Sequence, residues 1–172
     1  KFLNKPIAAL LGDGGIQRRE VPFLGYLFYI ADPKKIDMPY LIETDCKDFW
    51  EKIRRKETLT PEGIVEQAKA LYERYGFKDF KLKGGVLKGE EEMKAVEALH
   101  KTFPEARVNI DPNGAWSLEE AVKLCQNKHG VVAYMEDPCG PEAGFSSREI
   151  MSEFKTATNL KVATNMIATN WR

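Results

Sequence analysis

The feature that most constrains the fold is a regular alternation of short apolar segments with amphipathic segments from residue 60 onward. The apolar segments cover residues 77–83, 107–111, 131–136 and 161–165 and are predicted to be strands. Between them, apolar residues recur at helical spacing, which predicts helices that begin near residues 61, 89, 117 and 146. Strand–helix units that repeat about every 25–30 residues are typical of a parallel sheet with helical crossovers.

Residues at the expected helix ends support these boundaries. Thr60 precedes Pro61, which suits the first position of a helix, and Gly76 is expected to end that helix. The third and fourth helices open on a capping box, a serine followed three residues later by a glutamate. The two boxes are Ser117 with Glu120 and Ser146 with Glu149, and Gly130 is expected to end the third helix.

The residues before position 60 are less regular. Residues 1–15 hold a short, proline-started helix and a glycine stop, and we expect them to be the end of a preceding domain. Residues 20–31 form a nearly continuous apolar and aromatic run, which predicts a strand buried on both faces. Residues 32–59 read as a long charged connection. The chain is therefore α/β, with five strands and four crossovers.

Five such strands form either an open sheet or the first part of an eight-stranded barrel. No Gly-x-Gly-x-x-Gly motif follows a strand, so nothing supports a dinucleotide-binding fold. Polar residues end several successive strands, as in barrels whose sites lie at the carboxyl ends of the strands. This pattern favours a partial (β/α)8 barrel of the TIM type.

Three oxygen-bearing side chains end three consecutive strands, namely Asp111, Glu136 and Asn165. Neighbouring strands lie about 4.8 Å apart, so these groups can converge on one cation. Carboxylate and carboxamide oxygens suit Mg²⁺ better than zinc. Glu142, in the loop after the fourth strand, is a further candidate ligand. A single Asp-Pro or Glu-Asp-Pro is also explained by a turn, but three in succession favour a metal site.

Lys81 and Lys83 precede this set by one strand. Their spacing places both side chains on the same face of the strand. Neighbouring ammonium groups and a nearby cation lower a lysine's pKa, so one lysine can act as a general base. The alternative is a solvated strand edge. With the carboxylates, the pair indicates proton abstraction next to a substrate carboxylate, with a metal stabilising the enediolate.

Other polar and aromatic residues have ordinary explanations as well. Asn113 either contacts substrate or only forms the turn before Gly114, and Tyr26 suits a buried strand position. His100 and His129 lie near expected helix ends, and we expect neither to be catalytic.

Composition excludes some classes of function. The formal net charge is zero, which argues against binding to nucleic acid or a membrane surface through a basic patch. No apolar stretch is long enough to span a bilayer. Cys46, Cys125 and Cys139 fit neither a disulfide framework nor a zinc site, which suggests reduced thiols in a cytoplasmic protein.

Several segments together resemble the enolase superfamily and, within it, the glucarate dehydratases. The resemblance places residues 1–15 at the end of the N-terminal capping domain and residues 16–172 in the first part of a modified TIM barrel. It implies Mg²⁺-dependent dehydration of D-glucarate, and of related diacid sugars such as L-idarate, to 5-dehydro-4-deoxy-D-glucarate. The matching segments are residues 25–29, 77–87, 111–116, 136–140 and 163–169.

The resemblance also assigns roles to residues of this chain. It implies that Lys83 is the base for one stereoisomer and that Lys81 is its electrostatic partner. Metal ligands would be Asp111, Asn165 and either Glu136 or Glu142. Substrate-contacting positions would be Tyr26, Lys81, Asp111, Asn113 and Asn165. The full-length protein is expected to form a homo-oligomer.

Two departures from the family pattern leave alternatives open. The family's second base, a histidine paired with an aspartate, would lie beyond Arg172, and neither His100 nor His129 matches it. We therefore expect the isolated 172 residues to be inactive. Asn170 stands where active members more often carry aspartate. The alternatives are a paralogue with weak or different diacid-sugar activity, or a non-catalytic partner subunit of an active dehydratase. A phosphate-binding barrel lacks the glycine-rich loops it would need.

Overall fold

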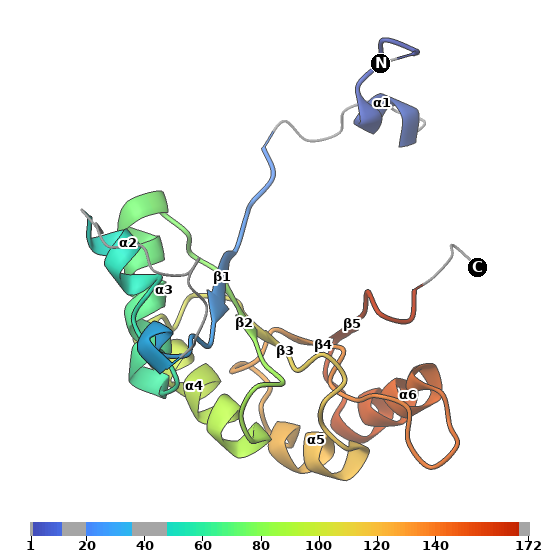
Figure 1. Ribbon diagram of the computed structural model, residues 1–172. Coiled ribbons are helices and arrows are strands. Elements are labelled where there is room, and N and C mark those ends of the chain that lie inside the picture. The colour runs from blue at the N-terminus through green and yellow to red at the C-terminus, as the bar shows by residue number, and fades with distance from the viewer. Residues whose placement is uncertain (1, 12–19, 36–47, 169–172) are drawn as a thin grey trace.

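The computed structural model describes residues 2–11, 20–35 and 48–168. Its centre is a five-stranded sheet in which every neighbouring pair is parallel and the strands follow one another in chain order (Figure 1). The strands are β1 (Gly25–Phe28), β2 (Phe80–Lys83), β3 (Val108–Asp111), β4 (Tyr134–Glu136) and β5 (Val162–Ala163).

The large helices α3 to α6 follow one another along a single side of this sheet (Figure 1). The helices are α1 (Ile7–Leu11), α2 (Phe49–Ile53), α3 (Pro61–Tyr75), α4 (Gly89–Thr102), α5 (Leu118–Cys125) and α6 (Ser147–Thr158), with a 3₁₀ turn at Pro33–Lys35. A doubly wound sheet would reverse its strand order and carry helices on both faces. Unreversed order with helices on one face is the arrangement of a barrel wall, so the prediction of a partial barrel is confirmed.

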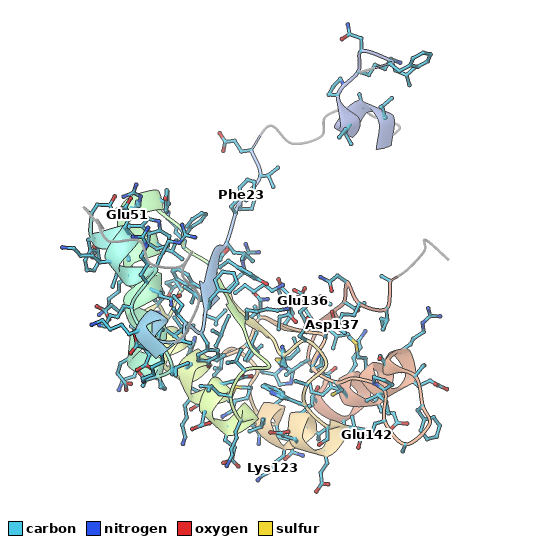
Figure 2. The ribbon with its side chains drawn as sticks, in the orientation of Figure 1. Phe23, Glu51, Lys123, Glu136, Asp137 and Glu142 are labelled. Atoms are coloured by element: carbon cyan, nitrogen blue, oxygen red, sulfur yellow. The ribbon has the colours of Figure 1, made fainter. Side chains whose placement is uncertain are left out.

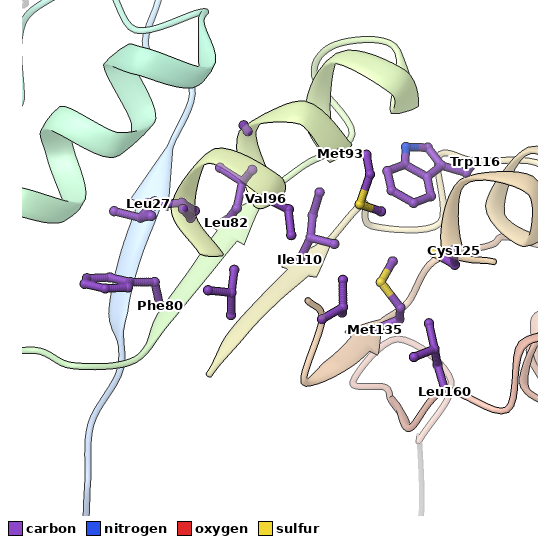
Figure 3. Packing of buried hydrophobic residues seen from close by; sticks show 14 of the residues in the cluster. Leu27, Phe80, Leu82, Met93, Val96, Ile110, Trp116, Cys125, Met135 and Leu160 are labelled. Carbon is purple, nitrogen blue, oxygen red and sulfur yellow. The ribbon is translucent and has the colours of Figure 1, made fainter. Parts of the chain in front are cut away.

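The hydrophobic core lies between the sheet and these helices (Figure 3). Leu27, Phe80, Leu82, Ile110 and Met135 point into it, and each is fully buried. Because side chains alternate along a strand, the residues between them point to the opposite, inner face. The apolar contacts therefore hold the helical layer, and the inner face remains available for polar groups.

The helix starts form as the sequence predicts. The side chain of Thr60 accepts a hydrogen bond from the backbone N–H of Gly63, and Gly76 ends α3 with a φ of 72°. Both halves of the capping box form between Ser146 and Glu149. Ser117 also caps α5, through the backbone N–H three residues on.

Some boundaries differ from the prediction. Helix α5 ends at Cys125, well before Gly130, because the chain turns through Asn127, whose φ is 59°. The strand predicted over residues 20–31 is reduced to β1, since its partner β2 begins only at Phe80, opposite Gly25. It is also not buried on both faces, because its burial alternates.

The charged connection before residue 60 contains α2, whose first turn is capped by Asp48 through the backbone N–H of Glu51. Cys125 and Cys139 are free and buried, as expected, and burial raises the pKa of each thiol to about 12. Cys46 and Asn170 lie outside the described residues. Among the described residues, no helix has the length and apolar character needed to cross a membrane.

Candidate active site at the carboxyl ends of the strands

The sheet register brings the predicted lysines and carboxylates to one level. Lys83 lies opposite Asp111 in the ladder between β2 and β3, and Lys81 lies opposite Asn109. All of these residues occupy inner-face positions, which alternate with the buried core positions of the same strands. The i, i+2 spacing of the lysines therefore has the predicted effect, and both reach the same edge of the sheet.

The lysines and carboxylates form one connected ion-pair network. The Nζ atom of Lys81 lies 2.6 Å from Oε2 of Glu136 and 3.1 Å from Oδ2 of Asp111. The Nζ atom of Lys83 lies 2.8 Å from the same Oδ2 of Asp111. Asp111 is thus shared by both ammonium groups. Its side chain is 2% exposed, against 12% for Lys81 and 29% for Lys83.

Burial and pairing act in opposite directions on the central groups. Burial by itself raises the pKa of Asp111, but hydrogen bonds from Lys83 and Lys81 outweigh it and hold this pKa below its usual value. Burial lowers the pKa of Lys81, but hydrogen bonds to Glu136 and Asp111 raise it above its usual value. This direction is opposite to the one expected from the lysine pair alone, because that reasoning left out the two carboxylates.

Asn113 serves both as a turn residue and as a partner of the site. Its φ is 60°, a left-handed conformation that asparagine tolerates, and its backbone N–H donates to Oδ1 of Asp111 over 3.0 Å. Its side-chain oxygen accepts a hydrogen bond from Lys83 over 2.8 Å. The two explanations considered from sequence are therefore compatible, since the turn places the carboxamide beside Lys83.

Tyr26 also reaches this network. Its ring lies below the Nζ atom of Lys81, 5.2 Å from the ring centroid, and it meets Phe28 edge-on. The side chain is 38% exposed, so it is not the buried aromatic that the strand position suggested. Its ring lies against the ammonium group of Lys81, in a position to contact a ligand bound there.

Glu142 and Asn165 lie differently from the other predicted ligands. Oε2 of Glu142 accepts a hydrogen bond from the backbone N–H of Leu118, at the start of α5. Figure 2 shows Glu142 beside the helical layer, well separated from Glu136. Asn165 lies two residues beyond β5 and is exposed. Metal coordination by either residue stays a prediction.

The carboxylate group that the structure does assemble includes one residue not considered from sequence. Ligand oxygens of Asp111, Glu136 and Asp137 all lie within 4.8 Å of one another, and all three carboxylates are buried or nearly so. Glu136 and Asp137 lie side by side at the end of β4 (Figure 2). Hard oxygen donors at this spacing fit a divalent cation such as Mg²⁺. The sequence signal for Asp137 was its place as the second acid of the Glu-Asp-Pro motif.

Sequence reasoning also missed Glu92, which shapes the loop after β2. This α4 residue is fully buried, and its carboxylate accepts backbone hydrogen bonds from Gly85, Val86 and Leu87 over 2.8–3.0 Å. A Cβ on Gly85 would lie 2.3 Å from the carbonyl oxygen of Pro112, so only glycine fits there. Glu92 therefore fixes the loop that follows Lys83 against the turn that follows Asp111.

A buried carboxylate network at the carboxyl ends of parallel strands, with two lysines on the neighbouring strand, defines the class of protein. The chain matches the enolase C-terminal domain-like family over residues 63–172. It belongs to the enolase superfamily, as the sequence motifs predicted.

Individual relatives agree with this assignment. The chain is 41% identical to the "Probable glucarate dehydratase" of Streptomyces coelicolor, over 99% of its own length and 36% of that protein. It is 37% identical to an enolase from Mycobacterium smegmatis solved with tartrate, with a TM-score of 0.76, covering 99% of this chain and 36% of that one. An enolase from Pseudomonas fluorescens, solved with magnesium, potassium and tartrate, is 39% identical with a TM-score of 0.76, covering 98% and 35%. The chain thus spans about a third of the length of these relatives.

Proposed function

We propose that the chain forms the first part of the barrel of a magnesium-dependent acid-sugar dehydratase, a carbon–oxygen lyase acting on D-glucarate and L-idarate. The observation that carries this proposal is the network in which Lys81 and Lys83 share Asp111 at the carboxyl ends of neighbouring strands. The glucarate dehydratase-like relative and a neighbour solved with magnesium and tartrate, itself a hydroxy diacid, support it.

In the proposed reaction the two lysines have different tasks. Lys83 is the more exposed of the two, and it takes the proton next to the substrate carboxylate. Lys81 is enclosed between Asp111 and Glu136, and as an ammonium group it stabilises the developing negative charge. The resulting enediolate loses hydroxide from the adjacent carbon, which leads to 5-dehydro-4-deoxy-D-glucarate.

Asp111 and Glu136 would hold the magnesium ion, together with Asn165 and with Glu142 as an alternative to Glu136. Bound Mg²⁺ would supply Lewis-acid stabilisation of the substrate carboxylate as its negative charge increases. Asn113 and Tyr26, which contact Lys83 and Lys81, are placed to orient the substrate.

The test is Lys83→Met in the full-length protein, measured as exchange of the α-proton with deuterium from solvent by NMR. We expect exchange to fall by about 10²–10⁴-fold with at least one of the two stereoisomers, because the general base is lost. Lys78→Met is the matched control, since Lys78 is exposed just before the start of the same strand. Undiminished exchange with both isomers would refute the role of Lys83, and turnover only of another diacid sugar would identify a paralogue.

The same assay applies to the isolated 172 residues. We expect no glucarate turnover from them, because the resemblance to the family implies that its second base lies on later strands of the barrel. Measurable turnover by this chain alone would contradict that expectation.

A further inference from the structure

Asp137 follows Glu136 directly, and its side chain has no role in the proposed reaction. It is 2% exposed and its φ is 39°, a left-handed conformation that residues other than glycine seldom adopt. Glu136 turns toward Lys81, whereas the carboxylate of Asp137 is engaged by the segment after β5. The contacts around Asp137 must therefore hold an unfavourable backbone conformation in place.

The side chain of Asp137 binds the segment that carries Asn165. Its Oδ1 accepts the hydroxyl hydrogen of Thr164 over 2.5 Å. Its Oδ2 accepts the backbone N–H groups of Asn165 over 3.1 Å and of Met166 over 3.4 Å. The hydroxyl of Thr164 in turn accepts the backbone N–H of Ile167. The carboxylate thus binds three consecutive residues after β5 directly and the fourth through Thr164.

The backbone of Asp137 also links the end of β4 to β5 and to the turn after β3. Its N–H donates to the carbonyl oxygen of Ala163 in β5 over 3.0 Å. Its carbonyl oxygen accepts the N–H of Gly114, in the turn after β3, over 2.7 Å. A Cβ on Gly140 would lie only 2.8 Å from the carbonyl oxygen of Gly114, so the loops after β3 and β4 are in close contact.

The three carboxylates Asp111, Glu136 and Asp137 lie together. Asp137 differs from the other two in the contacts that its side chain makes. Oδ2 of Asp137 accepts two hydrogen bonds from the segment after β5 and Oδ1 accepts one, so most of its capacity as an acceptor is already used by that segment. The three strand ends that Asp137 joins are those that carry Asp111, Glu136 and Asn165. Such a residue acts on a metal site through the ligands it orients.

We propose that Asp137 is a positioning residue of the cation site, which ties the β3, β4 and β5 ends together and sets Asn165 beside Glu136 without binding the metal itself. The inference rests on the proposed magnesium site and adds a residue to it. Substitution of Thr164 can separate a positioning role of Asp137 from direct metal binding. The Thr164 hydroxyl binds Asp137, and an uncharged residue there leaves every carboxylate of the site in place.

The experiment is calorimetric titration of the full-length protein with MgCl2, without substrate and well below the unfolding temperature of each variant. Asp137→Asn replaces an acceptor oxygen by an amide donor, and we expect the Kd for Mg²⁺ to rise about 10–100-fold. Thr164→Val removes only the hydroxyl and should raise the Kd about 3–10-fold, whereas Thr164→Ser should restore it. The double variant should be no weaker than Asp137→Asn alone, because both changes break the same contact.

Asp79→Asn is the matched control, because Asp79 also accepts three hydrogen bonds but lies at the opposite end of the sheet. Its Kd for Mg²⁺ should stay within about twofold of the wild type. Wild-type affinity for Mg²⁺ in Asp137→Asn or in Thr164→Val would overturn the inference. If Asp137→Asn does not fold, the result for Thr164→Val decides. A protein that binds Mg²⁺ but turns over no glucarate would refute the proposed function and leave this inference standing.

Discussion

The two ends of the sheet both carry charged clusters, but they are built differently. At the amino end, Asp79 pairs with Arg107, accepting its backbone N–H over 2.9 Å and two guanidinium N–H groups over 2.9 and 2.5 Å. The side chain of Arg107 is 68% exposed. At the carboxyl end, Asp111 is shared by Lys81 and Lys83, and its side chain is 2% exposed.

The difference shows which cluster can take part in binding. The pair at the amino end is self-contained, because two guanidinium N–H groups of Arg107 bind Oδ2 of Asp79 and the backbone N–H of Arg107 binds Oδ1. At the carboxyl end, the three carboxylates Asp111, Glu136 and Asp137 lie together, and within the described part of the chain Lys81 and Lys83 pair with two of them, Asp111 and Glu136. Buried charges interact strongly with one another, and a carboxylate cluster of this kind could also bind a further cation. The pairing at the amino end is therefore complete, whereas the carboxyl end has carboxylates that could also bind a cation.

The largest effect should follow from removing the shared carboxylate. Asp111→Asn in the full-length protein removes the negative charge that both lysines share and weakens a proposed metal ligand, so kcat/KM for glucarate should fall by on the order of 10³-fold. Asp79→Asn at the amino end should leave kcat/KM nearly unchanged. Steady-state kinetics of the two variants would measure the contrast. Equal losses in both would mean that the two ends do not differ in function.

An intermediate effect should follow from loosening the loop after β2. Glu92→Gln leaves one or more buried backbone N–H groups of residues 85–87 without an acceptor, so the free energy of unfolding should fall by about 3 kcal/mol. Urea unfolding monitored by circular dichroism measures this loss.

Glu91→Gln is the control for that experiment, because Glu91 is exposed and accepts one hydrogen bond, from Lys88 over 3.3 Å. A much smaller loss is expected there. If Glu92→Gln were no more destabilising than Glu91→Gln, the carboxylate would not be the anchor of this loop.

The smallest effect concerns the acid stability that the amino end provides. Burial raises the pKa of Asp79, but the hydrogen bonds from Arg107 outweigh it and hold this pKa below its ordinary value of 3.8. A depressed folded-state pKa stabilises the fold above the ordinary pKa, and that contribution is lost as pH falls through the folded value. Asp79→Asn should therefore flatten the dependence of unfolding free energy on pH below about pH 4.

Solvent exposure of Arg107 keeps this acid effect small, since exposed ion pairs contribute little. Urea titrations at several pH values measure the slope, and Glu105→Gln, a change at an exposed carboxylate, serves as the control. An unchanged slope in Asp79→Asn would show that its pairing with Arg107 is not linked to acid unfolding.

Much of the site was predictable because it depends on strand geometry. The i, i+2 spacing of Lys81 and Lys83 and the position of Asp111 and Glu136 at strand ends follow from a period of two and from parallel strands. The buried role of Glu92 could have been read from its place in the apolar stripe with Val96 and Leu99, at i+4 and i+7. It was missed because Glu92 is the last of three consecutive glutamates, residues 90–92, and such a run usually faces solvent.

Other features depend on contacts between segments far apart in the chain. The raised pKa of Lys81 follows from Asp111 and Glu136, which lie 30 and 55 residues further along the chain. The early end of α5 follows from a turn that the position of Gly130 does not reveal. The hydrogen bond of Glu142 to the start of α5 is likewise a property of loop packing.

The sequence by itself determined the α/β class of the fold and the side chains that share one face of each strand, because hydrophobic periodicity is a local property. Only the tertiary structure decided which charges meet. Register places Lys83 opposite Asp111, and loop contacts direct Asp137 toward Thr164 and Glu142 toward Leu118. Hydrogen bonds are short and directional, so shifts of a few ångströms between strand ends choose one partner over another.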